Sequence, residues 1–547
     1  MERYILHIIH GAEHRTRQFL EQQVRDPADL QYGGLRGDIW EAKPTVYALS
    51  QAVAVYLNPQ SCFYRDAAHC QAMNLALDFV ARTQRSDGYI DYPSCNFMSA
   101  PDTAFCFKRL YAAYRLLVRY DVPGDEALAL LRQKYLALLH SAVQAICAGG
   151  FHTPNHRWGI TAALLQGAEL FAGEPALAAR LKARAALYLA EGVDGDDDGE
   201  YAERSTGNYN AVVNNAMLAI YQQTGDDRYL GYVRRNLAMM LQYVDPDDTI
   251  FTQNSTRQDK GKLEYMDKYF YQYLYLAANG GGALYDAAAH KIIRDNAERG
   301  ALAPECLQIL MNHPEMLAHS FTHYGFLDTY RKYFKHAGVL RTATPAYTYT
   351  VLRGKSAFLY FKCGAAQLCV KIGESYCDIR NFIPQQLDVQ AQGCTLQGTA
   401  QGWYYQPFQT PPQTSDWWQM DQSKRDKLNT SKLHTTLQIT EQPDGLDLTL
   451  KTEGLDRLPL RLEICVPANA TLEHEAFRLD TNPGGELILR AGTVRLYSAG
   501  KTLELGPGFG EHAFHGHYSG EERNTEGYTL YCNAYTPFDK TFLIRVK

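Results

Sequence analysis

The sequence predicts an α+β protein with two domains: a helical N-terminal domain followed by an antiparallel β-sandwich. Apolar residues recur every three or four positions from the start of the chain to about residue 340, as in helices. Beyond that point, short runs alternate apolar and polar residues and are rich in β-branched and aromatic side chains, as in strands. The 547 residues also exceed one ordinary domain. We therefore expect a helical domain over residues 1–340 and a sandwich over residues 341–547.

The helical domain is expected to contain about twelve helices, separated by Gly, Pro and Asp residues that favour helix ends. The predicted helices cover residues 47–56, 70–82, 104–120, 126–147, 160–171, 176–191, 211–223, 228–244, 268–278, 284–298, 302–311 and 326–334. A domain with this many short-looped helices is commonly an (α/α) toroid. In that fold an inner ring of helices lines a cleft and an outer ring covers it.

The C-terminal part is expected to form strands separated by Gly, Pro, Asn and Asp turns. The predicted strands cover residues 347–353, 357–363, 367–372, 435–439, 446–452, 461–466, 487–489, 493–497 and 529–532. Residues 407–413, together with Trp417 and Trp418, predict a long loop inserted between two of them. Many short strands with frequent turns favour a sandwich.

Composition excludes several functional classes. The net charge of −6 gives no basic field for nucleic acid. No apolar run is long enough to span a membrane, and the N-terminus has no signal-peptide pattern, so we expect a cytoplasmic protein. The twelve Cys are scattered, which favours buried free thiols. No dinucleotide or phosphate-loop motif occurs in a fitting context, so no cofactor is expected. Self-association stays open.

Two segments place chemically active residues where a loop becomes a helix. Residues 155–158 read Asn-His-Arg-Trp and precede the predicted helix 160–171. Residues 199–209 read Gly-Glu-Tyr-Ala-Glu-Arg-Ser-Thr-Gly-Asn-Tyr and follow an acidic turn. Asn, His and Tyr are the residue types needed to remove a proton next to a carboxylate. An amide neutralises the carboxylate charge, and Tyr or His moves the proton.

These two segments, with the order of domains, resemble the heparinase II/III-like polysaccharide lyases. That family combines a toroid, a β-sandwich and an Asn-His pair that opens an inner helix. The resemblance implies cleavage of a uronic-acid-containing glycan by β-elimination. It implies that Asn155 neutralises the substrate carboxylate and that Tyr209 is the general base or acid. His156 would assist Tyr209, and Glu203 completes the expected catalytic set.

Eight further residues are expected to bind the substrate. They flank the two motifs or lie in polar stretches between helices: Asp102, Arg157, Trp158, Arg204, Asn254, Arg257, Asp259 and His323. A planar guanidinium such as that of Arg257 is suited to gripping a carboxylate. The lyase family usually adds a later His, for which His323 and His434 are the candidates. The expected ligand is an anionic glycan.

Structural interpretations of the same residues stay open. Asn155 and Asp102 are also suited to capping helices. Tyr209 is also suited to packing in a core. Glu203 is also suited to capping a helix or to pairing with Arg204. His512, His515 and His517 have a spacing that suits zinc, but no fourth ligand is evident, and no metal is expected.

Two other functions remain as alternatives. The first is a glycoside hydrolase, a β-glucuronidase or related uronidase, on the same toroid. It would use a pair of carboxylates drawn from Asp102, Glu200, Glu203 and Asp259. The second is a glycan-binding protein without catalytic activity, which needs a cleft but no titratable groups with shifted pKa values.

Overall fold

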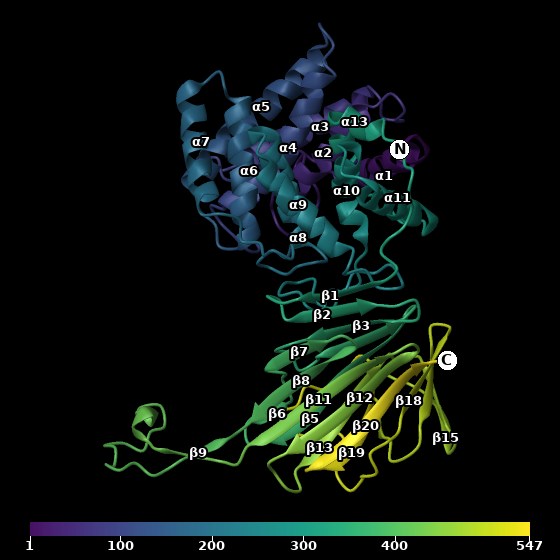
Figure 1. Ribbon diagram of the computed structural model, residues 1–547. Coiled ribbons are helices and arrows are strands. Elements are labelled where there is room, and N and C mark those ends of the chain that lie inside the picture. The colour runs from purple at the N-terminus through teal and green to yellow at the C-terminus, as the bar shows by residue number, and fades with distance from the viewer. The chain divides into compact units, whose positions relative to one another are not determined.

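The computed structural model describes all 547 residues and divides the chain into two compact units (Figure 1). The first unit consists of Met1–Val244 and Thr249–Phe326, and the second of Asp245–Asp248 and Leu327–Lys547. Helices fill the first unit and strands the second. The predicted fold class, a helical domain followed by an antiparallel sandwich, is confirmed.

The first unit contains thirteen α-helices and one short 3-10 helix. They are α1 (Glu2–Gln22), α2 (Lys43–Leu57), α3 (Ala67–Thr83), α4 (Ala100–Arg119), α5 (Glu126–Ala148), α6 (Pro154–Leu170), α7 (Pro175–Ala190), α8 (Tyr209–Thr224), α9 (Asp227–Met240), η1 (Met266–Tyr269), α10 (Phe270–Ala278), α11 (Ala283–Glu298), α12 (Leu307–Asn312) and α13 (Pro314–Leu317). The long α1 was not among the predicted helices.

Helices of the first unit form two layers, as expected for a toroid. The even-numbered helices α2, α4, α6 and α8 contact one another in order, and α3, α5 and α7 do so outside them. Gln272 of α10 bonds Ala211 O and Asn215 Oδ1 of α8, which extends the inner layer. The inner helix α6 is buried over most of its length, with twelve of its 17 residues buried. A helix that is apolar on nearly all faces belongs inside such a layer.

The second unit is a sandwich of two nine-stranded sheets. The first sheet contains β1 (Tyr330–Phe334), β2 (Val339–Ala343), β3 (Thr348–Leu352), β4 (Leu359–Cys363), β5 (Ala366–Tyr376), β6 (Ile379–Asn381), β13 (Pro459–Val466), β16 (Glu486–Ile488) and β19 (Tyr528–Tyr535). The second contains β7 (Gln386–Gln390), β8 (Gly393–Ala400), β11 (Leu433–Gln442), β12 (Gly445–Glu453), β14 (Thr471–His474), β15 (Phe477–Asp480), β17 (Val494–Ser498), β18 (Lys501–Gly506) and β20 (Phe538–Val546). Only the pair β16–β19 is parallel.

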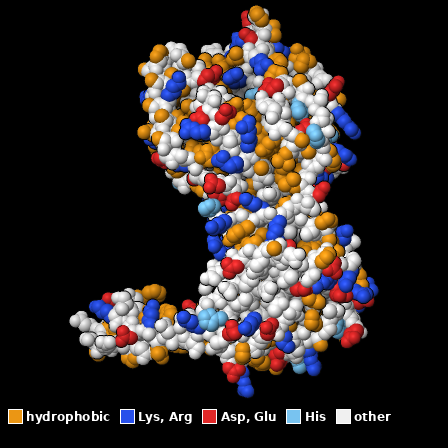
Figure 2. All heavy atoms as spheres, viewed as in Figure 1, with side chains coloured by type: hydrophobic (Ala, Val, Ile, Leu, Met, Phe, Trp, Pro, Cys, Tyr) orange, Lys and Arg blue, Asp and Glu red, His pale blue; other side chains and the backbone are white.

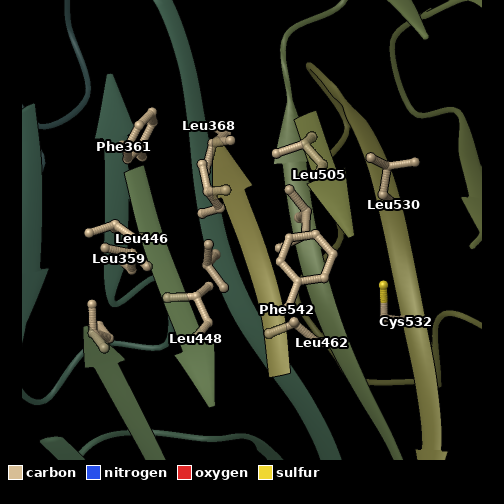
Figure 3. Close-up of a cluster of buried hydrophobic side chains, with 14 of the residues drawn as sticks. Leu359, Phe361, Leu368, Leu446, Leu448, Leu462, Leu505, Leu530, Cys532 and Phe542 are labelled. Atoms are coloured by element: carbon tan, nitrogen blue, oxygen red, sulfur yellow. The ribbon is translucent and has the colours of Figure 1, made fainter. Parts of the chain in front are cut away.

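The core of the sandwich lies between the two sheets. On β12, Leu446, Leu448 and Leu450 are buried, whereas the alternating Lys451 and Glu453 are exposed, which is the period-two pattern of a half-buried strand. Figure 3 shows Leu446 and Leu448 of this strand near Leu359, Phe361 and Leu368 of the other sheet. Each fully buried Leu contributes about 1.5–3 kcal/mol of transfer free energy.

The helix predicted over residues 326–334 is not present in the structure. Their apolar spacing of three and four suits a helix, but Tyr330–Phe334 form β1 and pair with β2 across a tight turn. Tertiary pairing here overrides the local pattern.

The predicted long loop lies in an arm built on β9 (Trp403–Tyr405) and β10 (Lys427–Asn429), which projects from the sandwich in Figure 1. Apolar side chains gather on this arm in Figure 2.

Two further observations concern the whole chain. All twelve cysteines are free thiols. No helix has both the length and the apolar character required to cross a membrane.

Candidate functional site

A cleft of about 1140 Å³ lies inside the first unit and is lined by the inner helices. On α8 its lining residues recur at helical spacing along one face: Tyr209, Val212, Asn215, Ala219 and Gln222. At a rise of 1.5 Å per residue, this face is about 20 Å long. The first turns of α4, α6 and α8 therefore meet at one end of a deep cleft.

The start of α6 is held by a carboxylate from a distant loop. Thr153, at the N-cap position, makes no side-chain capping bond. Instead, Glu203 accepts hydrogen bonds from the backbone N of Asn155 at 3.1 Å and from its side-chain Nδ2 at 2.8 Å. The positive end of the helix dipole favours this negative charge. Burial raises the pKa of Glu203, while the bonds from Asn155 and the charge of Arg257 oppose the rise.

Tyr209 is the first residue of α8, and a buried network fixes its backbone. Ser205 Oγ accepts a hydrogen bond from Tyr209 N at 2.9 Å and donates one to Asp259 Oδ1 at 2.8 Å. Asp259 Oδ2 also accepts from Gly207 N at 2.9 Å. The hydroxyl of Tyr209 stays at the cleft surface, where it donates to Gln258 Oε1 at 3.3 Å.

Arg257 connects the two motifs. Its Nε lies 3.4 Å from Glu203 Oε1, and its guanidinium carbon lies 5.1 Å from the centre of the Tyr209 ring. The side chain lines the cleft, and no protein group bonds its two terminal nitrogens. These nitrogens form a planar pair of donors that matches a carboxylate.

His156 lines the cleft beside Asn155. Its ring contacts Phe105 at a centroid distance of 5.9 Å and His152 at 4.6 Å. Burial, and then the neighbouring His152, lower the pKa of His156 to about 4. The imidazole is therefore neutral at neutral pH, and its buried Nδ1 has no hydrogen-bond partner.

Asp102 also lines the cleft, in the first turn of α4. Its carboxylate accepts hydrogen bonds from Lys43 at 2.6 Å, Ser99 at 2.5 Å and Asn96 at 3.2 Å. Burial opposes ionisation of Asp102, but the bonds from Lys43 and Ser99 outweigh it and hold the pKa below its usual value. Ser99 caps α4, so Asp102 is a paired carboxylate and not the cap itself.

Arg157 and Trp158 lie outside the cleft lining, although they directly follow His156. The fully buried Trp158 donates to Asp194 Oδ1 at 2.6 Å, and Arg157 pairs with Glu191 at 3.0 Å. Successive helical residues point about 100° apart, so neighbours in sequence face different sides of α6. These two residues tie α6 to the loop at 191–194.

Five more of the expected residues also lie outside the cleft lining. One is Glu203, although it bonds Asn155 and pairs with Arg257. Asp259 is the buried carboxylate that holds the 205–207 turn. Asn254, which precedes Asp259 in the same loop, is also buried. Arg204 has a positive φ of 48° in the loop before α8. His323 pairs with Asp286 at 3.0 Å, and His434 lies on β11, where its Nδ1 bonds Thr399 Oγ1.

The charge of the cleft is opposite to that of the whole chain. Seven cationic residues line it: Arg15, Lys43, Lys108, Arg109, Arg115, Arg257 and Lys268. Only three carboxylates do, namely Asp102, Asp267 and Glu305, which leaves an excess of four positive charges. Sequence reasoning missed all of these cations except Arg257. A usable signal was Lys108, Arg109 and Arg115 on the otherwise apolar α4.

The three histidines near the C-terminus do not form a metal site. No group of three or more His, Cys, Asp and Glu side chains is arranged to hold a metal ion. The ring of His517 instead bonds the backbone oxygen of Glu521 at 2.9 Å.

Comparison with solved structures shows that this architecture, a helical domain followed by an antiparallel β-sandwich, is shared with several polysaccharide lyases. The chain resembles xanthan lyase from Paenibacillus with a TM-score of 0.59 and 10% identity, over 100% of this chain and 57% of that one. It resembles chondroitin AC lyase from Streptomyces coelicolor with a TM-score of 0.56 and 12% identity, over 100% and 80%.

Heparan sulfate lyase from Pedobacter heparinus aligns with 98% of this chain and 87% of its own, with a TM-score of 0.52 and 10% identity. The sequence matches no family model and no curated protein. At such low identities the likeness establishes the fold, whereas activity has to be argued from the site.

Proposed function

We propose that the protein is a lyase that cleaves uronic-acid-containing oligo- or polysaccharides by β-elimination. The observation that carries this proposal is the continuous contact from Asn155 through Glu203 and Arg257 to Tyr209. The terminal nitrogens of Arg257, which no protein group bonds, lie near the Tyr209 ring in a cleft lined mostly by cations, and this arrangement supports the proposal. The polysaccharide lyases that share the fold support the same reaction class.

In this mechanism the substrate carboxylate binds the two free terminal nitrogens of Arg257. Asn155 is fully buried, and its side-chain nitrogen donates to Glu203 at 2.8 Å and to Thr153 Oγ1 at 3.3 Å. To bind the substrate carboxylate, this amide has to exchange the long bond to Thr153. Neutralising the carboxylate stabilises the negative charge that develops when the adjacent C–H bond breaks. This is the largest help that the site gives.

The proton next to the carboxylate then leaves, and Tyr209 is the group placed to move it. The electron pair of the C–H bond forms a carbon–carbon double bond as the glycosidic C–O bond breaks. The departing oxygen takes up a proton, so no water is consumed. Because its pKa is about 4, His156 is neutral at neutral pH, and it orients the sugar without adding charge.

The hydrolase alternative finds less support in the same geometry. A hydrolase needs one protonated and one ionised carboxyl group on opposite sides of the bond. Glu200 and Asp259 lie outside the cleft lining, and Asp102 is paired with Lys43. Glu203 is buried, does not line the cleft and accepts three hydrogen bonds from Asn155, so it is poorly placed to act on a sugar.

The test is incubation with a panel of uronate oligosaccharides. Ultraviolet absorbance of the product double bond and the number of new reducing ends are followed together. Elimination raises both signals in parallel. Reducing ends without absorbance mean hydrolysis, and binding without either signal means a glycan-binding protein.

A further inference from the structure

A second group of cations, Arg15, Lys108 and Arg109, lines the same cleft as Arg257. Lys108 and Arg109 follow Asp102 on α4 by six and seven positions, which is about 9–10 Å along the helix. Arg15 of α1 faces the same part of the cleft. Lys108 and Arg109 therefore lie farther along α4 than Asp102, which is in its first turn.

These three cations have only one carboxylate partner between them. Arg109 binds Glu305 at 2.6 Å and stacks over the Tyr47 ring at 4.9 Å. Arg15 donates from Nη2 to the backbone oxygen of Ala303, and its buried Nη1 has no partner. Lys108 has no protein partner at all. Every other cation in the cleft is paired with a carboxylate.

A cation without a counter-ion in this partly buried part of the cleft lowers the stability of the folded protein. Burial, and then the charge of Arg109, lower the pKa of Lys108 to about 8. Burial and Arg109 also lower the pKa of Arg15, although Glu305 opposes this. Lys108 and Arg15 are partly buried, and a cation with reduced access to water and no counter-ion is destabilised. A bound anion would offset this cost, and the surrounding Tyr47 and Tyr271 rings suit a sugar.

We propose that Lys108, Arg15 and Arg109 form a second anion subsite, which holds an acidic group on a sugar that is not the one being cleaved. The inference rests on the proposed function, because it assigns the substrate class more narrowly. The substrate is an oligosaccharide with at least two acidic groups. The second one is a carboxylate or a sulfate ester, and both present oxygens to Lys108.

The test measures binding in the Tyr209→Phe background, where turnover does not interfere. Unsulfated oligouronate tetrasaccharides and sulfated chondroitin and heparan tetrasaccharides are titrated by calorimetry, each beside its carboxyl-reduced or desulfated form. Lys108→Met is expected to weaken binding of the best acidic ligand roughly tenfold to a hundredfold. It should leave binding of the form that lacks the second acidic group unchanged, and Lys108→Arg should restore most of the affinity.

The exposed Lys182→Met on α7 is the matched control and should bind as the parent protein does. Equal loss of affinity for the acidic and the neutralised ligand would overturn the subsite, as would no loss at all. If Lys108→Met does not weaken binding of the carboxyl-reduced ligand, the subsite holds a carboxylate. If it does not weaken binding of the desulfated ligand, the subsite holds a sulfate.

Failure of the lyase proposal and failure of the subsite proposal give different results. If no tetrasaccharide binds or is cleaved, the lyase proposal is wrong. The subsite is then tested by itself through the effect of inorganic sulfate on Tm. A sulfate-dependent rise in Tm that is present in the wild type and lost in Lys108→Met supports the subsite. An equal rise in both proteins, or none in either, overturns it.

Discussion

The side-chain nitrogen of Asn155 lies 2.8 Å from both carboxylate oxygens of Glu203, although 48 positions separate the two residues. Both are buried, and Glu203 also accepts the backbone N–H of Asn155. This contact joins the two motifs that the sequence singled out. It also sets the start of α6 against the loop before α8, so it supports both the fold and the proposed site.

Asn155→Asp should destabilise the protein, because it places a second carboxylate against Glu203 in a buried position. We expect a loss of about 3 kcal/mol in the free energy of unfolding at neutral pH, measured by urea titration. Adding Glu203→Gln should recover most of this loss, since an amide and a carboxylate again face each other. Strictly additive effects of the two substitutions would contradict the contact.

Tyr209→Phe should lower kcat by roughly 10²–10⁴-fold and leave KM nearly unchanged. The ring stays in place, and the hydroxyl gives up only a 3.3 Å bond to Gln258, so the fold is retained. Tyr221→Phe on the same helix is the control and should keep full activity, because Tyr221 does not line the cleft. Near-normal turnover in Tyr209→Phe would remove Tyr209 from the mechanism.

Arg257→Gln should lower kcat/KM by roughly 10²–10³-fold, because it removes the charge that neutralises the substrate carboxylate. Arg257→Lys should fall between this variant and the wild type, since a lysine keeps the charge but loses the planar pair of donors. Initial rates on an acidic oligosaccharide measure both. Lys260→Gln, exposed in the same loop, is the matched control. If Arg257→Gln keeps normal activity, Arg257 does not neutralise the substrate carboxylate.

Glu200→Gln should stabilise the protein above neutral pH. Burial raises the pKa of Glu200 to about 7, against an ordinary value of 4.5. The folded state therefore holds a proton that the unfolded state releases above pH 4.5. Stability is lost as the pH rises from 4.5 to 7 and stays lower beyond it. The full difference is about 3 kcal/mol.

Urea unfolding of wild type and Glu200→Gln at pH values from 4 to 8.5 measures this difference directly. Other groups titrate equally in both proteins and cancel. The two curves should coincide near pH 4 and separate as the pH rises. A constant gap across the whole range would show that Glu200 ionises normally in the folded protein.

Helical periodicity and strand alternation predicted the order of the two units because each pattern reflects which face of an element is buried. Where pairing partners decide the outcome, as at Tyr330–Phe334, the local pattern misled. Asn155 and Tyr209, which were predicted from their places at helix starts, both line the cleft. Trp158 was assigned by adjacency alone, although helical geometry turns it away from the cleft. Lys108 was missed because it lies within an apolar helical run.

The most direct test of the central claim is the fate of water oxygen during cleavage. The reaction is run on a uronate oligosaccharide in water enriched in the heavy oxygen isotope, and new reducing ends and new non-reducing ends are analysed by mass spectrometry. Elimination predicts products that carry a double bond at the new non-reducing end and no heavy oxygen introduced by cleavage. Products that carry one heavy oxygen atom per bond cleaved and no double bond would contradict the lyase mechanism.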